Sequence, residues 1–209
     1  FFALYTQKVL YLTKIIAYES KQKERVAKMA QNYYQKEIET MPIEEMKKLQ
    51  SEKLVKQVKH VYENVPYYKN LMDEKGVKPD DIKSIDDIHK LPFLTKADLR
   101  DAYHYGLLAK PLDECVRIHS TSGTTGRRVV AFYTQNDVDL WEDCCARAIT
   151  AVGGTDGDVC QVAYGYGLFT GGLGAHYGAE HLGAMPMPMG PGNTDKQLRM
   201  MKDMKSTVL

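Results

Sequence analysis

The feature that most constrains the fold is the run HSTSGTTGRR at positions 119–128, which is framed by two β-rich segments. The run holds five hydroxyl side chains, two glycines and two arginines, and the flanking segments are CVRIHST (115–121) and RVVAFYT (128–134). Because β-branched and aromatic residues favour strands, the run should join two strands. A hairpin loop usually has about 2–5 residues with one or two turn formers. The length and composition of this run therefore indicate a binding loop.

Three interpretations compete for this run: a plain hairpin turn, a Walker-type loop and a phosphate cradle between two strands. The Walker pattern needs G-x-x-x-x-G-K-[ST] before a helix, whereas Gly123 and Gly126 are three residues apart and a strand follows. In a cradle, backbone N–H groups freed by glycine converge on anionic oxygens, while hydroxyls and an arginine add donors and charge. We predict phosphate binding by Ser122, Gly123, Thr124, Thr125, Gly126 and Arg127.

The region before this run is predicted to be helical. Apolar residues recur at helical intervals from Pro42, and Val65-Pro66 should end that helix because a residue before proline avoids helical angles. Short helices interrupted by Gly and Pro should follow, and Thr95 with Asp98 forms a capping-box pattern.

Helices and strands are expected to alternate after Pro111. Thr134 and Asp137 should open a helix over 138–152, which Gly153-Gly154 closes. The later expected elements are a buried strand (159–165), a helix ended by Gly183 (169–183), an extended piece (184–189) and a helix capped by Thr194 and Gln197 (195–205). This order predicts an α/β fold with parallel strands, helices on the sheet faces and right-handed crossovers.

The two ends of the sequence suggest part of a longer protein. Residues 1–20 are apolar enough to suggest a membrane segment, but Lys8 and Lys14 interrupt them, so no stretch reaches the ~18–20 apolar residues of a membrane span. We interpret 1–28 as an upstream extension, with a docking helix as the alternative, and 29–209 as an incomplete amino-terminal domain. The final TVL is interpreted as the start of another strand, whose ladder needs partners.

Charge and cysteine content narrow the class of protein. The 28 basic and 27 acidic residues are interspersed and leave a net charge of +1, which gives no basis for nucleic-acid binding. The four cysteines (Cys115, Cys144, Cys145, Cys160) lack the spacing of a C-x-x-C or zinc motif. We predict reduced, mostly buried thiols in a cytoplasmic protein.

Several segments resemble one enzyme family. SGTTGR (122–127) resembles the phosphate loop of the adenylate-forming acyl-CoA ligases. Longer segments resemble the phenylacetate–CoA ligases among them: YENVPYYK, LPFLTKADLRDAY, VRIHSTSGTTG, YTQNDVDLW and AYGYGLFTGGLGAHYGAEHLG. The resemblance extends from about Tyr33 to Leu209, and the last of these segments is the most specific.

The resemblance implies part of the large domain of an adenylate-forming enzyme that uses ATP, Mg²⁺ and coenzyme A. The carboxylate of an arylacetate, phenylacetate above all, would attack the α-phosphate of ATP, and the thiol of coenzyme A would then displace AMP. Thr121 through Gly126 would hold the β- and γ-phosphates. Arg127 stands where the family usually has lysine, and Arg128 where proline is common. The catalytic residues are expected beyond Leu209, so the 209-residue chain alone should not catalyse the ligase reaction.

A second glycine-rich run follows the strand predicted at 159–165. By resemblance, Tyr164 and Phe169 would form flat walls of an arylacetate pocket, and the small Ala175 would leave room for the ring. The alternative is that the glycines only let a helix pack closely on its neighbours; they are Gly171, Gly174 and Gly178. Both interpretations can hold together.

Other functions remain open at the level of sequence. His176, Glu180 and His181 share a helical face, but no third ligand stands at a convincing interval, so we predict no metal site and a polar face with satisfied side chains. Another aryl acid, such as indoleacetate or hydroxyphenylacetate, or a larger cofactor carboxylate, is an alternative substrate. A non-catalytic product that binds nucleotide or a partner is the alternative class. We expect no nucleic-acid or membrane partner and leave a homodimer open.

Overall fold

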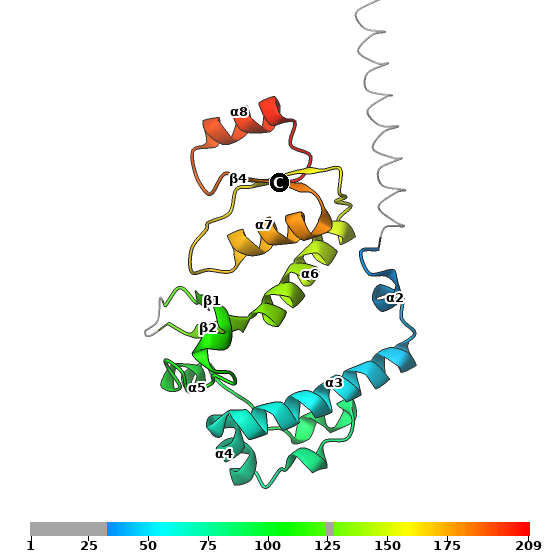
Figure 1. Cartoon of the computed structure of the whole chain (residues 1–209), viewed down its shortest axis with the longest axis vertical. Helices are drawn as coiled ribbons and strands as arrows, with labels where there is room; N and C mark the ends of the chain where they lie inside the picture. The colour runs from blue at the N-terminus through cyan, green and yellow to red at the C-terminus, as the bar shows by residue number, and fades with distance from the viewer. Residues whose placement is uncertain (1–32, 124–127) are drawn as a thin grey trace, which may run out of the picture. The chain divides into compact units, whose positions relative to one another are not determined.

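The computed structural model describes residues 33–123 and 128–209, and Figure 1 shows their helices and strands. The internal contacts divide the chain into two compact units. The described part of one unit covers 36–123, 128–141 and 164–174, and that of the other covers 33–35, 142–163 and 175–209. The predicted extension, 1–28, lies outside the described residues.

A helical region opens the first unit. Its elements are α2 (Lys36–Glu39), α3 (Ile43–Asn64), α4 (Pro66–Glu74), η1 (Pro79–Asp81), η2 (Ile85–Lys90), α5 (Lys96–Asp101) and η3 (Leu112–Glu114). Helix α3 packs against α4, η1 and η2 around a buried cluster of Val58, Met72, Val77 and Ile82. The predicted long helix is confirmed, and it ends at Asn64 because Val65 is extended (φ −121°) before Pro66. The capping box at Thr95 and Asp98 is also confirmed.

A charged cluster stabilises the turn between α4 and η1. The carboxylate of Asp73 accepts hydrogen bonds from Lys69 Nζ (2.7 Å), from Lys78 Nζ and from the hydroxyl of Tyr62 (2.8 Å). These bonds, above all that from Lys69, hold the pKa of Asp73 well below its usual value of 3.8. Both lysines also lie over the ring of Tyr62, with Nζ 5.2 and 5.5 Å from its centroid.

We expect Asp73→Asn to lower the urea midpoint of unfolding at pH 7. Because the folded state depresses the pKa of Asp73, its contribution is present above about pH 4 and is lost as the pH falls below the unfolded value. The difference between the variant and the wild type should therefore shrink from pH 7 to pH 3. Asp80→Asn, which changes an exposed carboxylate of the same unit, is the control and should leave the midpoint unchanged. A difference that stays constant with pH would contradict this role.

An antiparallel hairpin follows, made of β1 (Cys115–Ser120) and β2 (Val130–Thr134). Ile118 lies opposite Phe132, and His119 lies opposite Ala131. This pairing confirms that the hydroxyl- and glycine-rich run joins two strands. Helix α6 (Gln135–Ala151) begins directly after β2, where the backbone N–H and the hydroxyl of Thr134 both donate to Asp137, at 2.8 and 2.7 Å. The predicted opening of this helix is thereby confirmed.

The second unit holds a parallel strand pair. β3 (Val159–Val162) and β4 (Met185–Pro188) are parallel and are connected through α7 (Gly171–Leu182), which confirms the predicted parallel pairing. Gly183 ends α7 in the left-handed region (φ 88°), as predicted. The buried residues of this unit include Cys160, Ala179 and Ala184.

The last residues of the chain extend this parallel sheet. Cys160 and Val208 form a parallel bridge, and the N–H of Gln161 donates to the carbonyl of Val208 at 2.8 Å. The prediction that TVL begins a strand agrees with this pairing. The buried side-chain amide of Gln161 donates to Gln197 Oε1 (2.7 Å) and accepts from the hydroxyl of Ser206 (2.9 Å).

One predicted helix cap is wrong. Helix α8 (Thr194–Met204) is capped by Asn193, whose side-chain oxygen accepts from the N–H of Lys196 at 3.1 Å, and not by Thr194. Asn193 adopts a left-handed conformation (φ 50°), which asparagine tolerates better than most residues. The side chain of Gln197 is used elsewhere, since its amide donates to the carbonyl of Gly190 at 2.7 Å.

The four cysteines are free thiols, but only one is buried, so the prediction of mostly buried thiols is wrong. Cys160 is buried in β3, Cys115 and Cys145 are half-buried, and Cys144 is exposed on α6. Adjacent helical positions point about 100° apart, and this rotation leaves Cys144 exposed while Cys145 is half-buried. Within the described ranges, no helix combines the length and the apolar character that a membrane crossing requires.

Candidate functional site

The first half of the predicted phosphate loop lies at the end of β1. Thr121 and Ser122 are exposed, and Gly123 has a positive φ of 72°, a region that favours glycine. The other predicted members lie outside the described residues; they are Thr124, Thr125, Gly126 and Arg127. Phosphate binding by this loop remains a prediction.

Hydrogen bonds close the base of the loop. The N–H of Thr121 donates to the carbonyl of Val129 (3.0 Å), and the N–H of Val129 donates to the hydroxyl oxygen of Thr121 (3.1 Å). The guanidinium of Arg128 donates to the hydroxyl of Ser120 (3.3 Å) and to the carbonyl of Thr121 (3.2 Å). Arg128 therefore braces the loop base. This role could not be predicted from the sequence, because only the folded hairpin brings Arg128 back beside Ser120.

The second glycine-rich run meets the end of β1. The carbonyl of Leu168 accepts two hydrogen bonds from adjacent residues of β1, one from the N–H of Ser120 (2.8 Å) and one from Nδ1 of His119 (3.1 Å). Although about fifty residues separate them in the chain, the structure brings residues 164–170 beside the strand that leads into the predicted phosphate loop.

The two predicted aryl-pocket walls lie together in this run. The rings of Tyr164 and Phe169 are stacked, with centroids 6.5 Å apart and an interplanar angle of 20°. They are 56% and 51% exposed, so in this chain they form an open wall and not an enclosed pocket. Ala175 lies in α7 and is half-buried, and its role remains a prediction.

The glycines of α7 allow the close packing that the alternative interpretation requires. A Cβ atom on Gly171 would lie 2.7 Å from Cδ1 of Tyr164, and one on Gly174 would lie 2.8 Å from Cζ2 of Trp141. A Cβ atom on Gly172 would lie 2.8 Å from the carbonyl carbon of Gly165. Close packing therefore explains these glycines, and it also holds the wall residue Tyr164 in place.

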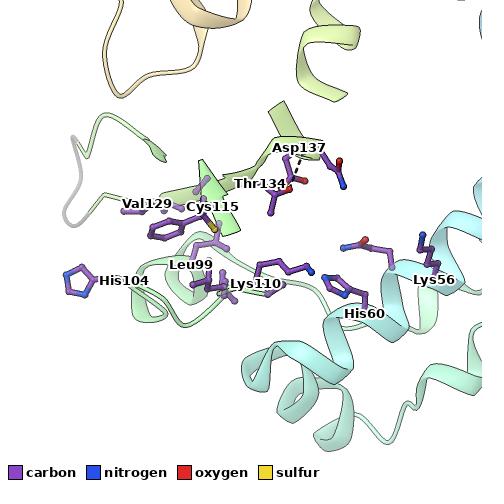
Figure 2. Close-up of a pocket in the computed structure, with 17 residues that line it drawn as sticks. Lys56, His60, Leu99, His104, Lys110, Cys115, Val129, Thr134 and Asp137 are labelled. Carbon is purple, nitrogen blue, oxygen red and sulfur yellow. Dashed lines mark hydrogen bonds between the residues drawn. The ribbon is translucent and has the colours of Figure 1, made fainter. Parts of the chain in front are cut away.

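A separate cavity of about 670 Å³ lies in the same unit (Figure 2). Basic side chains from α3 and from the segment before β1 reach it, among them Lys56, His60 and Lys110. Thr134 and Asp137 line its far side, where they are hydrogen-bonded to each other. None of the described residues predicted for phosphate or arylacetate binding lines this cavity.

Comparison with known proteins identifies the relatives of the chain. No protein-family model matches it. Curated proteins named phenylacetate–coenzyme A ligase are 50% identical over 172 residues in Aromatoleum evansii and 49% identical over 172 residues in Escherichia coli. A protein of the same name from Thermus thermophilus is 45% identical over 176 residues. The chain is homologous to the phenylacetate–coenzyme A ligases. These matches cover 82–84% of the chain but only 39–40% of each relative, so the chain spans about two fifths of their length.

Solved structures show the same relationship for the fold. A 2-hydroxyisobutyryl-CoA ligase in complex with 2-HIB-AMP and CoA has a TM-score of 0.78 and 31% identity to the chain, covering 83% of the chain and 38% of that protein. The same enzyme in the postadenylation state with R3-HIB-AMP has a TM-score of 0.77 and 28% identity, with the same coverage. The chain thus has the α/β fold of part of the large domain of an adenylate-forming CoA ligase, as the sequence predicted.

This homologue of the phenylacetate–coenzyme A ligases has no metal cluster within the described residues, where no group of three His, Cys, Asp or Glu side chains could hold an ion. His176 Nε2 lies 3.3 Å from Glu180 Oε1, and His181 Nε2 lies 2.9 Å from Asp143 Oδ1. These pairs agree with the predicted polar face of satisfied side chains.

Proposed function

We propose that the protein carrying this chain is an AMP-forming ligase that joins phenylacetate, or a related arylacetate, to coenzyme A. The observation that carries the proposal is the 45–50% identity to relatives that all bear one enzyme name, over more than four fifths of the chain. The acyl-AMP and CoA held by the 2-hydroxyisobutyryl-CoA ligase support the same chemistry.

In the proposed reaction, a carboxylate oxygen of the arylacetate attacks the α-phosphorus of ATP, and the bond to the bridging oxygen breaks to release pyrophosphate. The thiolate of coenzyme A then attacks the acyl carbon, and AMP leaves. Fixed donors are suited to the charge that grows on pyrophosphate. We assign the stabilisation of this pyrophosphate charge to residues 121–127. We assign the binding of the aryl ring to the wall of Tyr164 and Phe169, with Ala175 beside the ring.

Two features of the described structure support these assignments. The hydrogen bonds of Arg128 and Thr121 hold the base of the loop, so the segment that follows starts from a defined position. The stacked, exposed rings of Tyr164 and Phe169 present the flat apolar surface that an aryl group prefers. They stand on a segment hydrogen-bonded to the strand before the loop, so the two substrates would meet on neighbouring elements.

Magnesium, the cell compartment and the assembly are further parts of the proposal. ATP would be used with Mg²⁺, but the described residues offer no carboxylate cluster for the ion, so no step is assigned to it within this chain. The four free thiols support a cytoplasmic enzyme. We propose small-molecule partners only, with a homodimer as the assembly to test.

The expected result is that the complete protein forms phenylacetyl-CoA, AMP and pyrophosphate from phenylacetate, ATP and coenzyme A. The 209-residue chain alone should form none of these products. The assay is product detection by mass spectrometry together with acid-dependent exchange of labelled pyrophosphate into ATP. Release of ADP and phosphate would contradict the AMP-forming chemistry. A kcat/KM at least tenfold higher for indoleacetate or hydroxyphenylacetate than for phenylacetate would make that acid the preferred substrate.

A further inference from the structure

One carbonyl joins the two glycine-rich segments of the chain. The carbonyl oxygen of Leu168 accepts from the N–H of Ser120 and from His119 Nδ1. A carbonyl oxygen can only accept, so Nδ1 of His119 is the donor in this contact. Nε2 is fully buried and has no hydrogen-bond partner within the described part of the chain. Only Nδ1 of this side chain therefore makes a polar contact there.

Aromatic packing fixes the direction of the His119 ring. The side chain is 2% exposed. Its ring centroid lies 5.3 Å from that of Tyr133 and 5.3 Å from that of Trp141, edge-on in both cases. Trp141 in turn lies close to Gly174 of α7, and the guanidinium of Arg117 lies 5.6 Å from its ring centroid. The Nδ1–H bond vector is thus set by packing and not by rotation of a free side chain.

The segment that His119 contacts needs an external constraint. Residues 164–170 form no helix or strand, and they include two glycines, of which Gly167 has a φ of 138°. Glycine gives such a segment many alternative conformations. Leu168 directly precedes Phe169, one of the two exposed stacked rings, while His119 and Ser120 directly precede Thr121. The bonds at Leu168 therefore constrain the spacing between the aryl wall and the start of the predicted phosphate loop.

We propose that His119 is a positioning residue of the ligase reaction. Through Nδ1–H it holds the carbonyl of Leu168 and so sets the position of Phe169, and of the acid bound there, relative to the phosphates of ATP. This inference rests on the proposed function. Adenylate formation requires the carboxylate oxygen and the α-phosphorus to be held about 3–3.5 Å apart. A displacement of about 1 Å can reduce a reaction rate by about 100-fold. Loss of the bond should reduce the rate of the chemical step while each substrate still binds.

The test compares His119→Phe and His119→Asn in the complete protein. Phenylalanine keeps an aromatic ring between Tyr133 and Trp141 but removes the Nδ1–H donor. It also removes the buried, unpartnered Nε2, and the carbonyl of Leu168 keeps its bond from Ser120. Asparagine places an N–H donor near the position of Nδ1 but loses most of the ring contacts. The two variants should therefore rank in opposite orders: His119→Phe should be the more stable of the two and His119→Asn the more active.

For His119→Phe we expect a melting temperature equal to or above that of the wild type. Its kcat for phenylacetate-dependent pyrophosphate exchange should fall by about 10–100-fold, with the KM values for ATP and phenylacetate within about threefold. For His119→Asn we expect a lower melting temperature but a higher kcat than that of His119→Phe. A His119→Phe variant with wild-type kcat, or variants whose kcat simply follows their melting temperatures, would overturn the proposal. A wild-type protein without exchange on any arylacetate would instead overturn the proposed function.

Discussion

Replacing Gly178 by alanine should lower the free energy of unfolding by about 2 kcal/mol. A Cβ atom there would lie 3.0 Å from the backbone carbonyl carbon of Cys145 and 3.1 Å from the nitrogen of Ala146. Because the obstacles are the Cβ atom of Cys145 and the adjoining helix backbone, none of which can rotate away, α6 and α7 must separate around the fully buried Ala146 and Ala179. Such overpacking costs about 3 kcal/mol, and the higher helix propensity of alanine offsets about 1 kcal/mol.

Urea unfolding of the chain measures this effect, with Gly157→Ala as the control. A Cβ atom on Gly157 would meet nothing closer than Oγ1 of Thr155, at 3.8 Å. The control should change the free energy of unfolding by less than about 0.5 kcal/mol. Equal effects of the two substitutions would show that the close approach of α6 and α7 at Gly178 does not limit stability.

Replacing Gly172 by alanine should reduce kcat/KM for phenylacetate by at least about tenfold in the complete protein. Gly172 lies in the first turn of α7, where a Cβ atom would lie 2.8 Å from the carbonyl carbon of Gly165 and 3.2 Å from the nitrogen of Tyr166. The glycine-rich segment would have to shift, and Tyr164 and Phe169 would shift with it. A misplacement of about 1 Å in a substrate-positioning element can cost about 100-fold, so a tenfold loss is a conservative expectation.

Gly165→Ala is the matched control, because it adds a methyl group to the same segment where no atom lies within 4 Å. Steady-state kinetics with varied phenylacetate and varied ATP separates the outcomes. We expect Gly172→Ala to change the kinetics for the acid, to leave the KM for ATP near its wild-type value, and Gly165→Ala to change neither. Unchanged acid kinetics in Gly172→Ala would contradict the placement of the aryl ring against Tyr164 and Phe169.

Much of the local structure could be predicted from the sequence, because it depends on interactions within a few residues. The end of α3 before Pro66 follows from the steric effect of proline on its neighbour, and the start of α6 follows from the short-range bonds between Thr134 and Asp137. The hairpin around the hydroxyl- and glycine-rich run follows from the composition of its two flanks. The similarity to the phenylacetate–coenzyme A ligases could also be predicted, since it depends on the identity of residues and not on their coordinates.

Where local preferences were nearly equal, the sequence was a weaker guide. Both Asn193 and Thr194 are residues that cap helices, and only the folded chain shows that the side chain of Asn193 accepts the hydrogen bond from the N–H of Lys196. Cys144 and Cys145 look alike in the sequence, but the rotation of about 100° per residue exposes one and half-buries the other.

The sequence by itself determined the order of helices and strands, the position of the glycine-rich segments and the similarity to the phenylacetate–coenzyme A ligases. Only the tertiary structure decided that Arg128 braces the base of the loop and that His119 contacts Leu168, 49 residues further along the chain. The reason is physical: a hydrogen bond depends on distance and direction in space, and residues far apart in sequence acquire both only when the strands and helices between them have packed.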